Sequence, residues 1–400
     1  MKNRFFTKAI RTMNHRVSAG LYHHGFLILA LCLGVAAVNT FAQTETPPDP
    51  SAPKSVTIPA VKEKKLANGL TVAVVERKAS PIVTIQLLVK SGAADEAADK
   101  AGLANLTASM LTKGTKTRSA PQIAEDMEFL GGSLDTGAGW NNSVVTATVL
   151  SDKVDQAMAI LSDVVLNPAF DQKELDLLKS QTLDGLTYNL KQPGFLANYV
   201  ASKYSFDEHP AGGTPASLVS ITRDDVAAFH SKNYKSDMAV IIFTGDISLE
   251  KAAASAQNAF GKWEKWSGNQ GIRAEKVGSA STDKNNIVKR MLVIDLPNSG
   301  QASVNYVEPV YVARSSKDYY PAIVLNSVLG GGYSSRLNLE IRIKRGLSYG
   351  AGSGFTWRRN LANFATRTQT KNESAAEVAS LVIEELKKLR DTSVASTELV

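Results

Sequence analysis

The hydrophobic pattern of this 400-residue chain changes repeatedly between the period of a strand and the period of a helix. Apolar residues alternate at 82–89, whereas their spacing at 101–111 is helical. The same change recurs beyond a polar stretch at 265–286, where 363–370 reads as a strand and 374–390 as a helix. This interleaving predicts an α+β fold of two halves that share the same alternation of strands and helices and are joined by a linker, although no residue-level repeat relates the halves.

Turn and capping residues mark where several elements end. Asn68-Gly69 predicts a tight turn between two runs. Ser119 and Gln122 predict a capping box at the start of a helix that Gly131-Gly132 ends. Further strands are expected at 72–76, 143–150, 238–244, 291–296, 303–307 and 348–356. Further helices are expected at 152–166, 171–188, after 194, and at 222–233, 248–260, 319–329 and 336–344.

The first 42 residues read as an export signal. Five basic residues precede an apolar run at 26–38, and Ala42 ends a cleavage motif. The run has about thirteen residues, whereas a membrane span needs roughly 20. A lipoprotein-like sequence around Cys32 is weak, because the apolar run continues past the cysteine. We therefore expect cleavage after Ala42, a periplasmic or secreted protein, and no stable membrane insertion.

The predicted organisation follows from these signals. It comprises a signal peptide at 1–42, a flexible lead-in at 43–60, an N-terminal half at 61–264, a linker at 265–286 and a C-terminal half at 287–400. The chain stops in a polar segment soon after a helix, so the C-terminal half is expected to be incomplete.

Removal of the leader changes the charge and the reactive side chains. The leader carries five basic and no acidic residues, so the net charge falls from +7 to +2 and no basic field for nucleic acid remains. Cys32 is the single cysteine, so the mature chain has no disulfide, thiolate ligand or thiol nucleophile. His209 and His230 are the mature chain's histidines, and their spacing is not that of paired ligands on one helix.

One segment of the N-terminal half matches a known metal-binding helix. Residues 102–110 resemble the zinc helix of insulinase/pitrilysin peptidases, which read G-L-A-H-x-x-E-H-M there. In those enzymes two histidines hold zinc and the glutamate polarises its water. This chain has Asn105, Ala108 and Ser109 at the three positions. An amide, a methyl and a hydroxyl cannot perform this chemistry.

The family's third zinc ligand is a glutamate on a later helix. The matching region here offers only Asp184. The resemblance therefore implies two similar metallopeptidase-like α/β sandwich halves without a metal site, and no cofactor is expected in this chain.

A second match lies at 329–349, which resembles the C-terminal half of the same family. Arg342 and Tyr349 correspond to a pair, seven residues apart, that faces the zinc, contacts the substrate backbone and helps stabilise the oxyanion. From spacing alone they are a solvated helix charge and an ordinary strand aromatic. The run Gly330-Gly331-Gly332 resembles a substrate-binding loop of non-catalytic processing-peptidase subunits. It is not a phosphate loop, because no Gly-Lys-Ser/Thr follows.

Some bacterial and mitochondrial members of this family are heterodimers. One subunit carries zinc, and the other lacks it but supplies substrate-binding residues. The resemblance implies that this chain is the second kind: inactive alone, acting on peptides or unfolded chains beside a zinc-bearing homologous partner. Two alternatives remain open: a stand-alone peptide-binding or chaperone-like module, and a structural scaffold like the related subunits of respiratory complexes.

Overall fold

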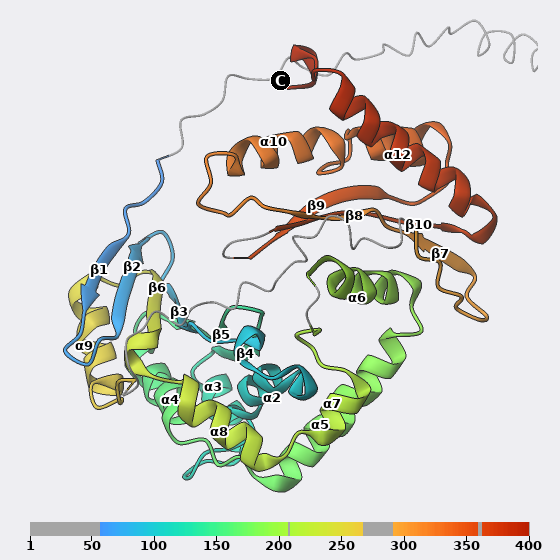
Figure 1. The fold of residues 1–400 in the computed structure, drawn as a ribbon. Coiled ribbons are helices and arrows are strands. Elements are labelled where there is room, and N and C mark those ends of the chain that lie inside the picture. Colours follow the sequence, from blue (N-terminus) through green and yellow to red (C-terminus); the bar gives the residue numbers. More distant parts are fainter. Residues whose placement is uncertain (1–56, 207–208, 267–290, 359–361, 400) are drawn as a thin grey trace, which may run out of the picture. The chain divides into compact units, whose positions relative to one another are not determined.

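The computed structural model describes residues 57–206, 209–266, 291–358 and 362–399 (Figure 1). The predicted signal peptide, most of the lead-in and nearly all of the predicted linker lie outside these residues. The contacts group Pro59–Val400 as one unit, so the predicted domain boundaries stay predictions. Among the described residues, no helix combines the length and apolar character that a membrane span requires.

The first half is built on a mixed six-stranded sheet. Its strands are β1 (Lys62–Lys65), β2 (Thr71–Glu76), β3 (Ile82–Val89), β4 (Ser133–Ala138), β5 (Ser143–Leu150) and β6 (Ala239–Gly245), in the order β1-β2-β6-β3-β5-β4. Strands β2 and β6 run parallel, and the other neighbours are antiparallel. Its helices are α2 (Leu103–Met110), α3 (Ala120–Phe129), α4 (Val154–Leu166), α5 (Gln172–Asn189), α6 (Pro193–Phe206), α7 (Pro215–Ser220), α8 (Arg223–Asn233) and α9 (Leu249–Phe260).

One face of the sheet is buried. Val83, Ile85 and Leu87 on β3 are fully inaccessible, while the residues between them are partly exposed. This period of two is the pattern that predicts a strand with one face on the core. Helices α4 and α9 contact β5 and β2 respectively and also contact each other. The predicted elements of this half are confirmed, including the Ser119 capping box of α3.

The second half holds a smaller antiparallel sheet around one long strand. Its strands are β7 (Gln301–Val304), β8 (Val307–Val310), β9 (Ala351–Trp357) and the central β10 (Ala362–Lys371). Its helices are α10 (Tyr319–Leu329), α11 (Arg336–Asn338) and α12 (Ala375–Asp391), and a π-helical turn (Leu339–Lys344) continues α11. Helices α10 and α12 pack on one face of this sheet (Figure 1). Helix α6, which belongs to the first half, contacts β7, β8 and β10.

Two strand predictions in the second half were wrong. Residues 291–296 form no strand, and Met291 and Val293 are exposed. An apolar run becomes a strand only when a neighbour takes its backbone hydrogen bonds, and no described strand pairs with this run. The single strand expected at 303–307 is two strands, β7 and β8, both paired to β10 and separated at Asn305-Tyr306.

Among the strands and α-helices of the described residues, β1, β4 and α7 were not predicted from the sequence. Strand β1 is entirely exposed and charged, with the sequence Lys62-Glu63-Lys64-Lys65, so no apolar alternation marks it. It exists because its backbone pairs with β2 across the predicted Asn68-Gly69 turn, where Gly69 has φ +88°.

His230 on α8 is held neutral by its surroundings. Burial lowers its pKa to about 4, and Lys235 adds to this effect, while the backbone carbonyl of Val165 opposes it by accepting a hydrogen bond from Nε2 at 2.9 Å. The ring also packs against Phe170 and Tyr234. The unfolded chain therefore binds a proton at this histidine at a higher pH than the folded protein does.

We expect His230 to make the protein less stable as the pH falls from about 6.5 towards about 4. Between about pH 7 and about pH 5, the wild type should lose up to about 2 kcal/mol more unfolding free energy than His230→Gln. The glutamine keeps a donor for Val165 but does not titrate. Urea unfolding of both proteins at several pH values tests this, and parallel pH profiles would contradict it.

Candidate functional site

Helix α2, which carries the substituted zinc positions, is fixed by the core of the first half. Leu106 and Met110 are buried on its inner side. Gly102 precedes the helix with φ +93°, a conformation that L side chains rarely adopt. The helix contacts β4, β5, α5 and α8, so its position is set by apolar packing.

A buried carboxylate caps α2 at its N-terminus. The Glu96 side chain is inaccessible, and its two oxygens accept hydrogen bonds from the backbone N–H groups of Gly102 (2.8 Å) and Ala104 (2.6 Å). The Nε2 atom of His209 lies 3.0 Å from the same carboxylate and 3.1 Å from the carbonyl oxygen of Ala93. A negative group at a helix N-terminus is favourable because it satisfies free N–H groups and the helix dipole. The contacts of His209 with Glu96 and Ala93 are therefore structural, and they lie beside the start of α2.

Sequence reasoning missed this cap and an aromatic contact next to it. Trp140, in the turn between β4 and β5, packs against His209 with ring centroids 5.0 Å apart. The guanidinium of Arg358, which follows β9, lies 4.1 Å from the Trp140 centroid, and burial lowers its pKa to about 10. The sequence did offer one signal for the cap, because Glu96 is an acidic residue shortly before a predicted helix. No local pattern connects residues so distant in sequence.

The three substituted positions do not form a metal site. Asn105 and Ser109 are partly exposed one turn apart, and Ala108 is fully buried. Asp184, the one candidate for a third ligand, is exposed on α5. Within the described ranges, no three His, Cys, Asp or Glu side chains are grouped closely enough to ligate an ion. A catalytic zinc needs three such ligands, so the donor set here does not fit it.

Arg342 lies on the π-helical turn of the second half and is exposed. Its neighbours Lys344 and Arg345 both pair with Glu340, and these contacts lower the pKa of that carboxyl. Arg342 makes no ion pair within the described part of the chain, and its guanidinium lies 5.0 Å from the ring centroid of Tyr333. Single π-turns inside helices are frequent at functional sites. The turn therefore presents an unneutralised guanidinium to solvent.

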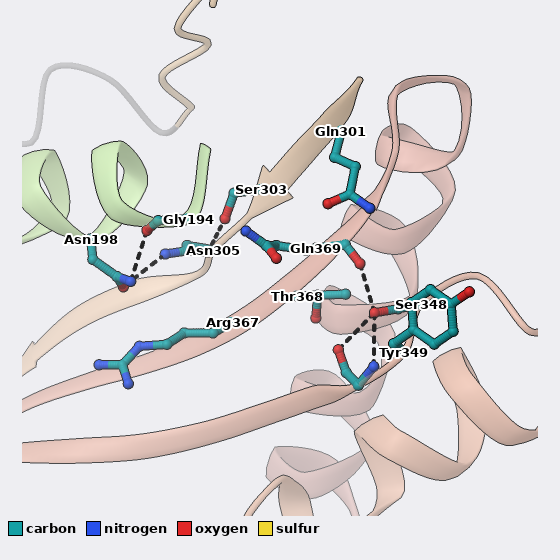
Figure 2. Close-up of a pocket in the computed structure, with 11 residues that line it drawn as sticks. Gly194, Asn198, Gln301, Ser303, Asn305, Ser348, Tyr349, Arg367, Thr368 and Gln369 are labelled. Carbon is teal, nitrogen blue, oxygen red and sulfur yellow. Dashed lines mark hydrogen bonds between the residues drawn. The ribbon is translucent and has the colours of Figure 1, made fainter. Parts of the chain in front are cut away.

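Tyr349 lies in the connection before β9 and is 92% exposed. It borders a cavity of about 470 Å³ (Figure 2). The cavity is lined by Gly194, Asn198, Gln301, Ser303, Asn305, Ser348, Tyr349, Gly350, Arg367, Thr368 and Gln369. Arg342 does not line it, and no hydrogen bond or ring contact joins Arg342 to Tyr349 in the described residues. The structure therefore places only Tyr349 of the predicted pair at a cavity.

The glycine run has a packing role at its first two positions. A Cβ added at Gly330, which follows α10, would lie 2.4 Å from the backbone nitrogen of Ser353 on β9. One added at Gly331 would lie 2.8 Å from the Cα of Ser327. A Cβ at Gly332 would meet nothing within 4 Å. Substrate binding by these glycines stays a prediction, because none of them lines the cavity.

Family profiles match most of the chain. The profile described as Insulinase (Peptidase family M16) matches residues 71–194, and the one described as Peptidase M16 inactive domain matches residues 220–399. The chain belongs to the M16 family. Because the M16 zinc residues are replaced at Asn105, Ala108 and Ser109, it is a non-catalytic member of that family.

Relatives and solved structures agree with this placement. The chain is 28% identical to an uncharacterized zinc protease of Rickettsia bellii over 293 residues, 72% of this chain and 68% of the relative. It is 27% identical to the non-peptidase homolog YmxG of Helicobacter pylori over 319 residues, 77% of this chain and 71% of that protein. The crystal structure of a peptidase M16 inactive domain from Pseudomonas fluorescens matches with a TM-score of 0.71 and 27% identity, covering 84% of this chain and 81% of that one. Pitrilysin shares the fold, with a TM-score of 0.62 and 17% identity over 37% of its own chain.

We expect the protein purified without a partner to bind no stoichiometric zinc and to hydrolyse no peptide. The reason is the donor set at Asn105, Ala108 and Ser109. Elemental analysis with a peptidase assay tests this, and a tightly bound zinc with chelator-sensitive activity would contradict it. The triple variant Asn105→His, Ala108→Glu and Ser109→His should gain weak zinc binding without efficient turnover. It would still lack a third ligand, and residue 108 is fully buried.

We expect Gly330→Ala to destabilise the second half, because its new Cβ meets the backbone of β9. Overpacking of this kind typically reduces unfolding free energy by about 1–3 kcal/mol. Gly332→Ala is the matched control, since its Cβ enters open space and neither glycine has a left-handed φ. Thermal unfolding followed by circular dichroism compares the two. Equal melting temperatures would contradict this prediction, because they would show that the backbone near Gly330 shifts to accommodate the new Cβ without loss of stability.

Proposed function

We propose that this protein is the non-catalytic, substrate-binding subunit of a heterodimeric periplasmic zinc metallopeptidase that acts on peptides or unfolded chains. The observation that carries the proposal is a contrast between the halves. The zinc positions on α2 are lost, whereas Arg342 is unneutralised and Tyr349 is almost fully exposed. Neither side chain has a hydrogen-bond or ion-pair partner among the described residues, and a guanidinium and a phenol are donors suited to a carbonyl oxygen that develops negative charge.

The zinc belongs to the partner in this proposal. The partner is a homologous subunit with an intact H-x-x-E-H helix, where the metal would polarise water and the scissile carbonyl. Arg342 and Tyr349 then act in trans on the substrate. The M16 inactive-domain match and the non-peptidase name of the Helicobacter pylori relative support a non-catalytic role. Export to the periplasm rests on the basic and apolar pattern of the first 42 residues.

We expect Tyr349→Phe to lower turnover of the assembled heterodimer by about 10²–10³, the typical effect of removing a positioned oxyanion donor. Assembly and stability should be unchanged, because the ring remains and the phenol makes no hydrogen bond within the described residues. Arg342→Ala should also weaken substrate binding, because it removes a charged donor. The measurement is steady-state peptidase kinetics after co-expression with zinc-bearing M16 homologues.

Matched controls exist on α10 and in the segment before it. Tyr320→Phe removes the hydroxyl of another exposed tyrosine. Arg314→Ala removes a guanidinium that also lies over a tyrosine ring, that of Tyr319. Both controls should keep wild-type kinetics. If Tyr349→Phe and Arg342→Ala also keep wild-type turnover and substrate affinity, the pair is a relic and the protein is a scaffold. If peptides bind but no zinc-bearing homologue yields activity, the stand-alone peptide-binding alternative holds.

A further inference from the structure

The cavity beside Tyr349 has an unusual chemical lining. Its eleven residues include no carboxylate and no aliphatic side chain, and Arg367 carries the one formal charge among them. Arg367 and Gln369 come from β10, Gln301 and Ser303 from β7, and Asn198 from α6. The cavity therefore favours a polar ligand, since an apolar one would leave the amides and the guanidinium desolvated without hydrogen bonds.

One wall is fixed by its own hydrogen bonds (Figure 2). The Ser303 hydroxyl donates to Asn305 Oδ1 (3.1 Å), and Asn305 Nδ2 donates to Asn198 Oδ1 (3.2 Å). Asn198 Nδ2 in turn donates to the carbonyl oxygen of Gly194 (2.8 Å). This series of hydrogen bonds connects α6 with β7 and with the segment that follows β7. It satisfies these side chains internally and holds the wall in place.

Four other polar side chains of the lining are exposed and have no such partners. Those of Gln301, Tyr349, Arg367 and Gln369 make no hydrogen bond or ion pair with the residues that the structure describes. Most of their hydrogen-bonding groups are donors: a guanidinium, a phenol and two amide NH₂ groups. The cavity thus offers an excess of donors and one positive charge, which calls for an acceptor that carries one negative charge.

We propose that this cavity binds a carboxylate of a peptide, with Arg367 as its charged partner. The guanidinium fork matches the two oxygens of a carboxylate, and hydrogen bonds to charged groups are stronger than those between neutral groups. Gln301 and Gln369, which line the same cavity, would hydrogen-bond the adjoining peptide backbone. A single guanidinium suits a singly charged carboxylate better than a phosphate. The proposal deepens the proposed function and rests on it, because it names what the subunit recognises in its substrate.

One glycine of the lining provides a direct test. A Cβ added at Gly350 would meet nothing within 4 Å, so a larger side chain fits beside the cavity without a backbone clash. Gly354, further along on β9, is equally unobstructed but does not line the cavity. Gly350→Val should therefore block the cavity, while Gly354→Val tests the effect of the same substitution elsewhere on this segment.

The experiment measures binding by the full mature chain alone, using fluorescence anisotropy of a short N-terminally labelled Ala/Ser peptide. The peptide is used in three forms: with a free C-terminal carboxylate, with a C-terminal amide, and with that amide plus one internal glutamate. We expect the free acid to bind and the plain amide to bind at least about tenfold more weakly. Recovery with the glutamate form would show that side-chain carboxylates are also accepted, and no recovery would assign the site to chain ends. Equal binding of all three forms would overturn the proposal.

Variants localise the effect to this cavity. Arg367→Gln should weaken binding of the free acid about tenfold and abolish the difference from the amide. Lys317→Gln removes one positive charge from an exposed site outside the cavity and should change neither value. Gly350→Val should abolish binding and Gly354→Val should retain it, with thermal unfolding as the check on folding. If Arg367→Gln binds all three peptides like the wild type, the carboxylate is not held here.

These results separate this inference from the function on which it rests. If the protein binds a carboxylate through Arg367 and yet supports no hydrolysis with any zinc-bearing homologue, that result would keep the cavity assignment and overturn the heterodimer. Conversely, if a heterodimer hydrolyses peptides with kinetics and affinities that Arg367→Gln does not change, that result would keep the heterodimer and overturn the cavity assignment.

Discussion

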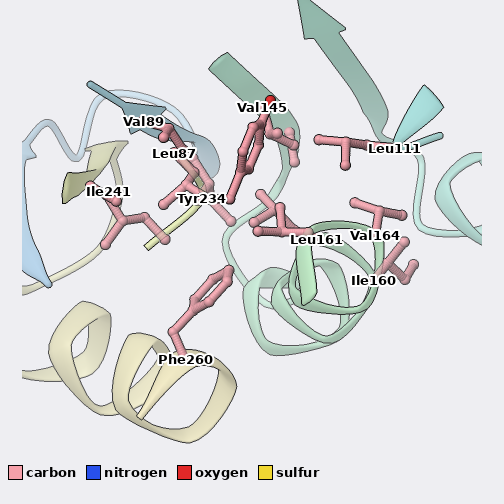
Figure 3. Close-up of a cluster of buried hydrophobic side chains, with 14 of the residues drawn as sticks. Leu87, Val89, Leu111, Val145, Ile160, Leu161, Val164, Tyr234, Ile241 and Phe260 are labelled. Atoms are coloured by element: carbon pink, nitrogen blue, oxygen red, sulfur yellow. The ribbon is translucent and has the colours of Figure 1, made fainter. Parts of the chain in front are cut away.

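The apolar contact between the first sheet and its helices is the interaction on which the rest of this structure depends. Leu87, Val145 and Ile241 project from neighbouring strands towards Leu161 of α4 and Phe260 of α9 (Figure 3). All five are almost inaccessible, so the sheet and the helices exclude water together. Helix α2 is held by the same core and by the buried Glu96 cap. Its position therefore does not require a metal ion.

This independence explains how the helix can persist without the zinc residues. A structural zinc contributes folding free energy directly, but a catalytic one sits on a frame that packing has already built. At residue 108 the M16 pattern has a glutamate, and this chain buries the methyl group of Ala108 instead. Burying a methyl group is favourable, whereas burying an unpaired carboxylate is not. The substitutions on α2 are thus compatible with the stability of the first half.

The sequence predicted the elements whose signal is local. The alternation in β3, the capping box of α3 and the helical pattern of α10 each lie within one segment, and the structure confirms them. The strand expected at 291–296 failed because a strand also needs a partner, which its own residues do not specify. The Glu96 cap and the cavity beside Tyr349 were missed for the same reason. Their residues come from distant segments that only the folded chain brings together.

The two halves differ in how their polar groups are satisfied, and this difference bears on function. In the first half, the buried polar groups at the start of α2 have hydrogen-bond partners within the protein. Glu96 accepts hydrogen bonds from two backbone N–H groups, and His209 lies within hydrogen-bonding distance of it. In the second half, Arg367 lines a cavity, is exposed, and has no ion-pair partner in the described residues. Arg367 and Gln369 are exposed, so water satisfies their donors in the free protein, and an acceptor on another molecule can displace that water. An excess of donors is useful when the acceptor arrives on another molecule, and that asymmetry favours a binding role over a purely structural one.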